Sequence, residues 1–342
     1  MLFGRKLVNN FYKYKRKAFQ SVCLKITRSI STREPSRILF FGTDNFSLPS
    51  LQALHKNCSH NLGVVTSFKS PANCVRTYAE REKLPLQRWP ITEDQCTDYD
   101  LGVVVSFGHM IPAQIINAFP RGMINVHASL LPLWRGAAPI IYAIMKGDAR
   151  TGVSIMKIEP HHFDIGAVLA QREVPIRRDI YMPELHASLS LLGADLLVDT
   201  VNNLSDRLKN AKPQENATAS YAPKITSKIT EILWTELSAD ELYARHRALY
   251  GYKNLTTSFL DKQIQLLELR LPEKHLTVQE PGHFSYQRSR KSLLIGCAQG
   301  TQLEVLQVRV EGRKPMSAQD FSNGFLRQAR SLQFTHNKQV AC

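Results

Sequence analysis

Several features that mark common classes of protein are missing from this sequence of 342 residues. Its longest apolar runs, such as Leu101–Phe107, have the length of a strand, whereas a membrane helix needs roughly 18–20 apolar residues. The six cysteines form no C-x-x-C pair, and none has a histidine at zinc-finger spacing. We therefore expect no membrane-spanning segment and no metal. In a long chain without a secretory leader we expect free thiols in a reducing compartment.

Acidic residues are absent from the first 33 positions, which hold nine Lys or Arg residues with scattered hydroxyl and apolar side chains. The long apolar core of a secretory signal is also missing there. A basic, hydroxylated, acid-free segment is typical of a mitochondrial presequence. The alternative is a disordered basic arm that binds RNA, but such an arm has no need for the phenylalanines and tyrosines of this segment. We interpret residues 1–33 as a presequence that directs the chain to the mitochondrial matrix.

The rest of the charge is distributed unevenly along the chain. Residues 34–220 hold equal numbers of basic and acidic residues, whereas residues 221–342 hold 17 basic and 11 acidic ones. The chain thus divides into a cationic leader, a neutral body and a basic C-terminal part.

Apolar runs without polar alternation indicate buried strands in the body. The first four are predicted at 37–43, 62–67, 101–107 and 123–127. Helical spacing lies between the early runs, at 47–55 and 75–83, and this order indicates βαβ units and a mostly parallel sheet. Further strands at 151–158 and 168–174 and a helix at 182–204 follow. The layout is Rossmann-like, but Phe41–Phe46 has one glycine where a dinucleotide fingerprint needs three, so we expect no NAD site.

A polar stretch at 208–220 has the composition of a linker. Beyond it, leucine spacing predicts a helix over 231–250, and short alternating runs at 263–269, 293–297 and 303–310 predict a small β-barrel. We accordingly divide the chain into a presequence (1–33), a catalytic domain (34–207), a linker (208–228) and a C-terminal domain (229–342).

The chemistry is concentrated at the end of the fourth strand. Asn125 and His127 are two residues apart, so on a strand they face the same side. Open α/β sheets bind ligands at the carboxyl ends of such strands. An amide and an imidazole there can donate hydrogen bonds to an oxygen that becomes negative when a carbonyl is attacked, and imidazole can move a proton near neutral pH. Asp164, before Gly166, could support His127 in moving protons.

Each of these signals is weak by itself. A single histidine at a strand end is more often structural than catalytic, and an aspartate before a glycine is usually part of a turn. No serine or cysteine lies in a recognised nucleophile motif, so covalent catalysis has no candidate.

The run Asn125–Pro139 carries a resemblance to a known family. It contains the pattern N-x-H-x-S-L-L-P, followed by Trp134-Arg135-Gly136-Ala-Ala-Pro139. This resembles the signature of the 10-formyltetrahydrofolate-dependent formyltransferases, in the version found in the enzymes that act on methionyl-tRNA. Further segments that resemble the family extend the coverage from about residue 36 to 330: 37–54, 103–112, 221–225 and 312–320.

The resemblance implies roles for particular residues. Asn125, His127 and Asp164 take the catalytic positions of the family, and no metal is implied. The folate-binding stretch corresponds to Ser129, Leu130, Leu131 and Pro132, and the loop of Phe107, Gly108, His109 and Met110 lines the pterin pocket. The implied fold is a Rossmann-like formyltransferase domain followed by an OB-like barrel that contacts tRNA. One departure is the stretch 67–75, which is shorter and less basic than the loop with which bacterial members hold the acceptor stem, so we assign no acceptor-stem residues.

The implied function is transfer of the formyl group of 10-formyltetrahydrofolate to the amino group of initiator methionyl-tRNA, for mitochondrial translation. We take the chain to be a monomer without a membrane partner. A folate-dependent enzyme acting on a small molecule is one alternative, although it has no use for a basic barrel. A catalytically dead RNA-binding protein is the other, although its Asn, His and Asp positions would not need to be intact.

The excess of positive charge in the C-terminal part points to it as the surface that contacts tRNA. Phosphate contacts are predicted for two clusters, although each could equally be a solvated face of the barrel: Arg288, Arg290 and Lys291, and Arg309, Arg313 and Lys314.

Overall fold

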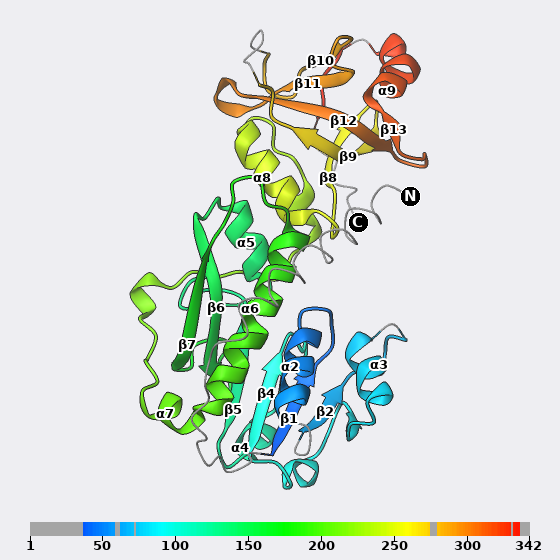
Figure 1. Cartoon of the computed structure of the whole chain (residues 1–342). Helices are drawn as coiled ribbons and strands as arrows, with labels where there is room; N and C mark the ends of the chain where they lie inside the picture. The colour runs from blue at the N-terminus through cyan, green and yellow to red at the C-terminus, as the bar shows by residue number, and fades with distance from the viewer. Residues whose placement is uncertain (1–36, 59–61, 72, 274–278, 330, 336–342) are drawn as a thin grey trace, which may run out of the picture. The chain divides into compact units, whose positions relative to one another are not determined.

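The computed structural model describes residues 37–58, 62–71, 73–273, 279–329 and 331–335. The predicted presequence, residues 1–33, lies outside the described residues. Two sheets dominate the fold, one in each half of the described chain (Figure 1). None of the helices in the described ranges has the length and apolarity that crossing a membrane requires.

The first sheet has seven strands in the order β3-β2-β1-β4-β5-β6-β7. Its strands are β1 (Ile38–Gly42), β2 (Leu62–Thr66), β3 (Leu86–Arg88), β4 (Leu101–Val105), β5 (Met123–His127), β6 (Arg150–Lys157) and β7 (Val168–Pro175). β3 to β5 run parallel, whereas β6 and β7 pair in antiparallel fashion. The predicted strands and the mostly parallel, Rossmann-like sheet are therefore confirmed. The strand order reverses between β1 and β4, which is where sheets of this type open a crevice for ligands.

The apolar character of β1 follows from helices and loops that cover both faces of the sheet. Ile38 and Phe40 enter one buried cluster, while Leu39 and Phe41 enter another on the opposite face. A strand buried on both faces has no polar side, so the sequence shows continuous apolar residues instead of alternation.

The helices of the described chain follow the predicted pattern in the first half. They are α2 (Leu48–Cys58), α3 (Cys74–Arg81), α4 (Ala113–Asn117), α5 (Pro139–Met145), α6 (Met182–Asn202), α7 (Leu204–Lys209), α8 (Ala239–Leu249) and α9 (Ala318–Phe325). Short 3-10 helices are η2 (Glu93–Cys96), η3 (Asn216–Thr218), η4 (Ser227–Thr230), η5 (Ala298–Gly300) and η6 (Leu326–Gln328). α2 and α6 supply apolar side chains to the same cluster as Ile38 and Phe40, so they cover the same face.

The second sheet is antiparallel, with the order β10-β11-β12-β9-β8 and β13 beside β12. Its strands are β8 (Leu255–Phe259), β9 (Lys262–Arg270), β10 (Phe284–Gln287), β11 (Ser292–Gly296), β12 (Gln302–Val310) and β13 (Met316–Ser317). Residues 331–335 bridge both edges, through Ser258 of β8 and through His283 next to β10, which closes the sheet. The interior is aromatic, with Phe334 stacked on Phe284 at 4.3 Å and on Trp234 at 5.9 Å between ring centroids. An antiparallel C-terminal sheet is therefore confirmed.

The predicted helix over 231–250 is wrong in its first part, because α8 begins only after Ser238. The Ser238 hydroxyl accepts a hydrogen bond from the Glu241 amide, and the Glu241 carboxylate accepts one from the Ser238 amide. This reciprocal cap fixes the start of a helix. Before it, Glu231 bridges to Thr256 in the second sheet. Leu233 and Leu237, which suggested a longer helix, flank a turn in which the Leu233 carbonyl accepts from the Glu236 and Leu237 amides.

Candidate active site

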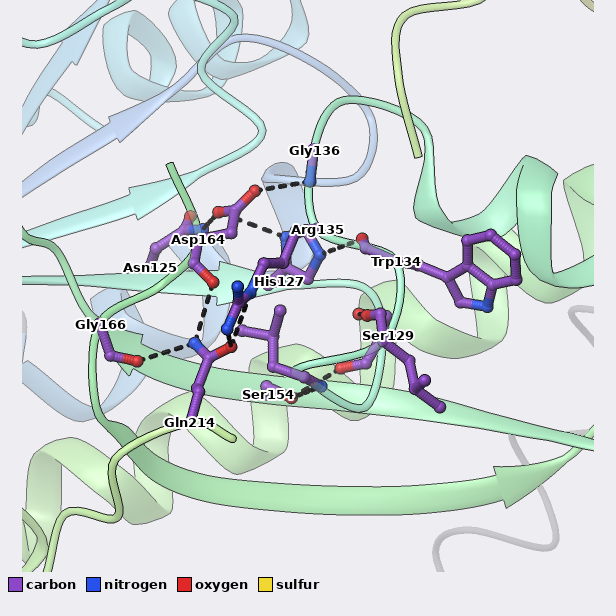
Figure 2. A network of polar contacts seen from close by, with 12 residues as sticks. Asn125, His127, Ser129, Trp134, Arg135, Gly136, Ser154, Asp164, Gly166 and Gln214 are labelled. Atoms are coloured by element: carbon purple, nitrogen blue, oxygen red, sulfur yellow. Dashed lines mark hydrogen bonds and ion pairs between the residues drawn. The ribbon is translucent and has the colours of Figure 1, made fainter. Parts of the chain in front are cut away.

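Asn125, His127 and Asp164, the three residues that the sequence singles out, lie together at the carboxyl end of β5 (Figure 2). Asp164 reaches them from the turn between β6 and β7. Its Oδ1 lies 3.6 Å from His127 Nδ1 and accepts a hydrogen bond from Asn125 Nδ2 at 3.4 Å. Its Oδ2 accepts a shorter one, 2.8 Å, from the Gly136 amide. The topology of the sheet thus brings residues far apart in sequence to one edge.

The contacts of His127 determine which ring nitrogen can exchange a proton. Nε2 lies 2.9 Å from the carbonyl oxygen of Trp134. A carbonyl can only accept, so Nε2 carries a hydrogen and donates it. The Nδ1 atom then faces Asp164, and in the neutral ring it holds the free lone pair. His127 is itself buried, so this nitrogen is the one through which the ring can gain or lose a proton toward the cluster.

Trp134 is anchored on both its backbone and its side chain. Its amide donates to the Ser220 hydroxyl at 2.9 Å, and its indole Nε1 donates to Asp148 Oδ2 at 2.6 Å. Burial raises the pKa of Asp148, while the indole hydrogen bond opposes that change. Trp134 has a φ of +58°, a conformation that non-glycine residues rarely adopt. These contacts stabilise the strained backbone and keep its carbonyl directed at His127.

Asp164 lies in an equally strained turn, with a φ of +53°. Gly166 closes this turn against β6, where a Cβ atom would lie only 1.8 Å from the Lys157 carbonyl oxygen. The Asp-Ile-Gly sequence therefore has a backbone reason, because only glycine permits so close an approach. Phe163 and Ile165, which flank Asp164, are exposed at 65% and 39%.

The predicted folate-binding stretch 129–132 forms the loop after β5. Ser129 is fully buried, and its hydroxyl donates to the Leu133 carbonyl at 2.6 Å. Ser154 of β6 ties the loop down further, donating to the Ser129 carbonyl and accepting from the Leu131 amide. The Ser129 side chain therefore shapes the loop. Folate binding by Ser129, Leu130, Leu131 and Pro132 stays a prediction.

The second predicted folate-binding stretch, Phe107–Met110, follows β4 and so lies at the same sheet edge. Phe107 is buried and packs edge-on against Phe41 and Trp89, so it belongs to the core. Gly108 and Met110 are exposed and His109 is half-buried. Folate contacts from this loop stay a prediction that rests on these last three residues.

The end of β4 is also tied to the end of β1. The Thr43 hydroxyl donates to the Ser106 carbonyl, and the Ser106 hydroxyl donates to Asp44 Oδ2 at 2.5 Å. Asp44 in turn accepts from the amides of Phe46 and Ser47. The segments that follow β1 and β4, where the strand order reverses, are therefore held together by hydrogen bonds.

Two residues of the site were missed by sequence reasoning, Arg135 and Gln214. Arg135 is 3% exposed, and its guanidinium donates to the side-chain oxygens of Gln214 and Asn216. Gln214 also donates to the backbone at Asp164 and Gly166. Gln214 falls in the stretch predicted to be a linker, and nothing in a polar stretch marks one glutamine as different from its neighbours. That stretch is docked against the catalytic loops.

The predicted tRNA-binding residues of the C-terminal sheet fall into two groups. Four are exposed: Arg288, Lys291, Arg313 and Lys314. Arg290 instead pairs with Oε1 of the fully buried Glu304 at 2.6 Å, and Arg309 donates to Gln265 at 3.3 Å. Arg290, together with Arg270, therefore balances the charge of a buried carboxylate. The position of Arg290 in a basic cluster of the sequence did not indicate this role.

The cluster at the end of β5 can perform one kind of chemistry well. Asn125 offers an amide donor, His127 a nitrogen that can exchange a proton, and Asp164 a carboxylate that supports the protonated ring. The nearby Ser129 hydroxyl is occupied and buried. Across the described ranges, no group of three or more His, Cys, Asp or Glu side chains has a geometry that could hold a metal ion. The arrangement suits direct attack by a nucleophile of the substrate on a carbonyl whose oxygen becomes negative.

Comparison with known proteins places the chain among formyl-transferring enzymes. Residues 36–201 match the "formyl transferase" family model, and residues 224–326 match "formyl transferase, C-terminal domain". The mitochondrial methionyl-tRNA formyltransferase of Mus musculus is 36% identical over 87% of this chain and 80% of its own length, and that of Homo sapiens is 37% identical over 87% and 79%. A bacterial methionyl-tRNA formyltransferase, from Roseobacter denitrificans, is 36% identical over 84% of this chain and 95% of its own.

Solved structures share the fold at lower identity. The N-formyltransferase of Helicobacter canadensis, solved with folinic acid and dTDP-3-aminofucose, gives a TM-score of 0.63 at 16% identity, over 79% of this chain and 98% of that one. HypX of Aquifex aeolicus, solved with tetrahydrofolic acid, gives 0.57 at 17% identity, over 86% of this chain and 48% of that one. These two likenesses concern the fold alone.

Proposed function

Because the chain belongs to the methionyl-tRNA formyltransferase family, we propose that it transfers the formyl group of 10-formyltetrahydrofolate to the amino group of initiator methionyl-tRNA, for translation in mitochondria. The observation that carries the proposal is the meeting of Asn125, His127 and Asp164 at the end of β5, within the part of the chain that the family model covers. An amide, an imidazole and a carboxylate in contact are what acyl transfer to an amine requires.

The reaction joins the amine nitrogen to the formyl carbon and breaks the bond between that carbon and the folate nitrogen. As the amine attacks, the formyl oxygen becomes negative and can accept a hydrogen bond from the amide nitrogen of Asn125, and from His127 Nδ1 once that atom has taken the proton of the amine. His127 relays the proton that the amine loses, and Asp164 supports the ring while it is charged. The leaving folate nitrogen takes up a proton in exchange, so the charges balance.

The formyl donor is assigned to the crevice beside this cluster. The supporting observations are the strand-order reversal between β1 and β4 and the loop at the same edge, where Gly108 and Met110 are exposed and His109 is half-buried. The loop of residues 129–132, which follows β5, is proposed to form the other side. A ligand held there would present its reactive carbon to His127 and Asn125.

The methionyl-tRNA is assigned to the basic C-terminal domain. The exposed residues Arg288, Lys291, Arg313 and Lys314 are the groups proposed to contact phosphates. Residues 1–33 are proposed to direct the chain to the mitochondrial matrix, and the chain is taken to act as a monomer.

One assay separates this function from the small-molecule alternative. The wild-type enzyme is given 10-formyltetrahydrofolate and one of three acceptors: methionyl-tRNA, free methionine or an amino sugar nucleotide. We expect rapid formylation of methionyl-tRNA alone. Equal or faster formylation of a free amine would contradict the proposed substrate, while leaving the formyl-transferring chemistry intact.

The role of the leader is tested separately. Removing residues 1–33 should leave formylation of methionyl-tRNA unchanged in vitro and should leave the protein in the cytosol of the cell. A tenfold loss of tRNA affinity on this deletion would support the alternative, a basic arm that binds RNA.

A further inference from the structure

Arg135 is a buried cation without an acidic partner among the described residues. Its guanidinium makes three hydrogen bonds, all to amide oxygens: Nε and Nη2 to Gln214 Oε1 at 3.0 and 2.8 Å, and Nη1 to Asn216 Oδ1 at 3.0 Å. A buried charge is costly unless its donors are satisfied. The segment that contains Gln214 and Asn216 is therefore held against the loop that carries Trp134 and Arg135.

Backbone pairing fixes this segment at both ends. Lys212 exchanges two hydrogen bonds with Val168 of β7, and Ala222 donates to the Arg135 carbonyl at 2.7 Å. Between them, Gln214 points into the site, as Figure 2 shows. The stretch between the two domains is thus fastened on one side of Gln214 to the edge strand β7 and on the other side to the loop after β5.

The orientation of the Gln214 amide is determined by its neighbours. A guanidinium only donates, so Gln214 Oε1 must face Arg135. The Nε2 group is then directed at two carbonyls, which it meets at 2.9 Å for Asp164 and 2.8 Å for Gly166. One side chain therefore clamps both ends of the strained turn that carries Asp164.

We propose that Gln214 is a positioning residue for the transfer reaction, which holds the Asp164 carboxylate against His127 through its hydrogen bonds to the Asp164 and Gly166 carbonyls. The proposal rests on the proposed function and extends the catalytic centre into the connecting segment. Asp164 has a positive φ, so its turn relaxes when the clamp is removed and its carboxylate leaves the place beside His127 Nδ1 and the Gly136 amide. Displacements of about 1 Å at a reacting group can cost up to roughly 10²-fold in rate.

The substitution Gln214→Glu separates this role from simple anchoring. A carboxylate keeps an acceptor for Arg135 and adds charge complementarity, so the segment stays docked, while its second oxygen takes the place of Nε2 and repels the Asp164 and Gly166 carbonyls. The same carboxylate cannot donate to the two carbonyls of the Asp164 turn. We expect kcat to fall by roughly 10–100-fold, with the KM for 10-formyltetrahydrofolate within about twofold of the wild type.

Two further variants complete the comparison. Gln214→Met removes all the hydrogen bonds at similar length and should lower both kcat and the melting temperature. Asn216→Ala is the matched control, because Asn216 contacts the same guanidinium but neither carbonyl of the Asp164 turn. It should lose some stability and keep its kcat.

A spectroscopic readout follows Asp164 without any turnover. The Gly136 amide donates to Asp164 Oδ2, so its proton chemical shift reports the position of the carboxylate. We expect this resonance to move upfield in Gln214→Glu and Gln214→Met and to stay in place in Asn216→Ala. The dependence of kcat on pH should change in the same two variants only.

The proposal would be overturned if Gln214→Glu kept the kcat, the pH profile and the Gly136 amide chemical shift of the wild type. If that variant does not fold, Gln214→Met is judged by the same Gly136 shift, and an unmoved resonance would again overturn it. His127→Ala is assayed in parallel. An active His127→Ala enzyme would refute the proposed catalytic assignment, whereas an inactive one beside an active Gln214→Glu would refute the positioning role alone.

Discussion

Two buried or nearly buried carboxylates, one in a turn beside the first sheet and one on a strand of the second, have opposite surroundings. Glu304 on β12 is fully buried and contacts two guanidinium groups, those of Arg270 and Arg290. Asp164 contacts the Asn125 amide, the Gly136 amide and a histidine ring. Guanidinium groups stay charged at every accessible pH, so Glu304 is permanently neutralised. The partner of Asp164 can gain or lose its charge.

This difference separates a structural carboxylate from a reactive one. A carboxylate paired with two guanidinium groups stabilises the packing around it. A carboxylate beside an imidazole gains its counter-charge only when the ring is protonated, which is the situation in a proton relay. The distinction depends on which groups meet in three dimensions, so the basic cluster around Arg290 could not reveal it.

The comparison predicts its largest effect at Asp164. Asp164→Asn and Asn125→Ala should each lower kcat by roughly 10²–10³, because each removes a group that stabilises developing charge. Single-turnover formylation of methionyl-tRNA measures the change directly. Unchanged circular dichroism and melting temperature would show that the loss is chemical.

Glu304→Gln is the matched carboxylate control in the other sheet. It should lower the melting temperature and leave kcat at the wild-type level. A Glu304→Gln enzyme that folds but loses activity as Asp164→Asn does would break the distinction between the two carboxylates.

A second prediction concerns His246, a histidine that has rings for neighbours instead of a carboxylate. It is buried on α8 among Tyr181, Tyr243 and Tyr250, with Arg247 nearby. Burial, reinforced by Arg247, lowers its pKa from 6.5 to about 4. Between these two pH values the unfolded chain binds a proton that the folded chain rejects, so acid destabilises the fold.

The free energy of unfolding should therefore fall by about 1.4 kcal/mol per pH unit between pH 6.5 and 4 through His246 alone. His246→Phe keeps a ring in this cluster and removes the nitrogens that bind the proton. It should therefore make the free energy of unfolding less dependent on pH between 4 and 6.5. Urea denaturation at several pH values measures the slope. Parallel curves for the wild type and His246→Phe would show that His246 does not carry the acid sensitivity.

The third prediction uses Arg290. Arg290→Ala leaves Glu304 with Arg270 as its remaining guanidinium partner and should destabilise the protein by roughly 1.5–3 kcal/mol, the range for a hydrogen bond to a charged group. Arg288→Ala, two residues away and exposed, is the control and should have no measurable effect on stability. Equal denaturation midpoints for the two variants would show that the ion pair between Arg290 and Glu304 does not stabilise the fold.

The smallest effect is expected in the exposed turn between β12 and β13. Replacing Arg313 and Lys314 with Ala should raise the KM for methionyl-tRNA a few-fold. A plot of log KM for methionyl-tRNA against log salt concentration should also become less steep, by roughly 0.7–0.9 for each phosphate that the variant no longer neutralises. The KM for 10-formyltetrahydrofolate should not change. If this variant and the double variant of Arg288 and Lys291 both keep the wild-type salt slope, the C-terminal sheet is not the surface that contacts tRNA.

The sequence predicted most of the first half of the fold because its strands are buried on both faces. Their continuous apolar runs leave little ambiguity, and the spacing of Asn125 and His127 at a strand end indicated a site. Short strands such as β3 and β10 are only partly buried and were missed. The helix predicted over 231–250 was too long because leucine spacing was given more weight than the cap formed by Ser238 and Glu241.

The contacts that support the site could not be predicted. Arg135 and Gln214 are 79 residues apart, and neither residue type indicates that the two side chains meet. The same is true of Arg290, which lies in the turn between β10 and β11 and has its buried partner Glu304 on β12. Local patterns indicate which residues could react, whereas long-range packing decides which of them are held in place and which are already paired.

The most direct test of the central claim is the rate of formyl transfer to methionyl-tRNA by His127→Ala, measured at saturating 10-formyltetrahydrofolate against the wild type. We expect kcat to fall by roughly 10²–10³ while the melting temperature and the affinity for 10-formyltetrahydrofolate stay the same. A folded His127→Ala enzyme with near-wild-type turnover would contradict the assignment of Asn125, His127 and Asp164 as the catalytic centre.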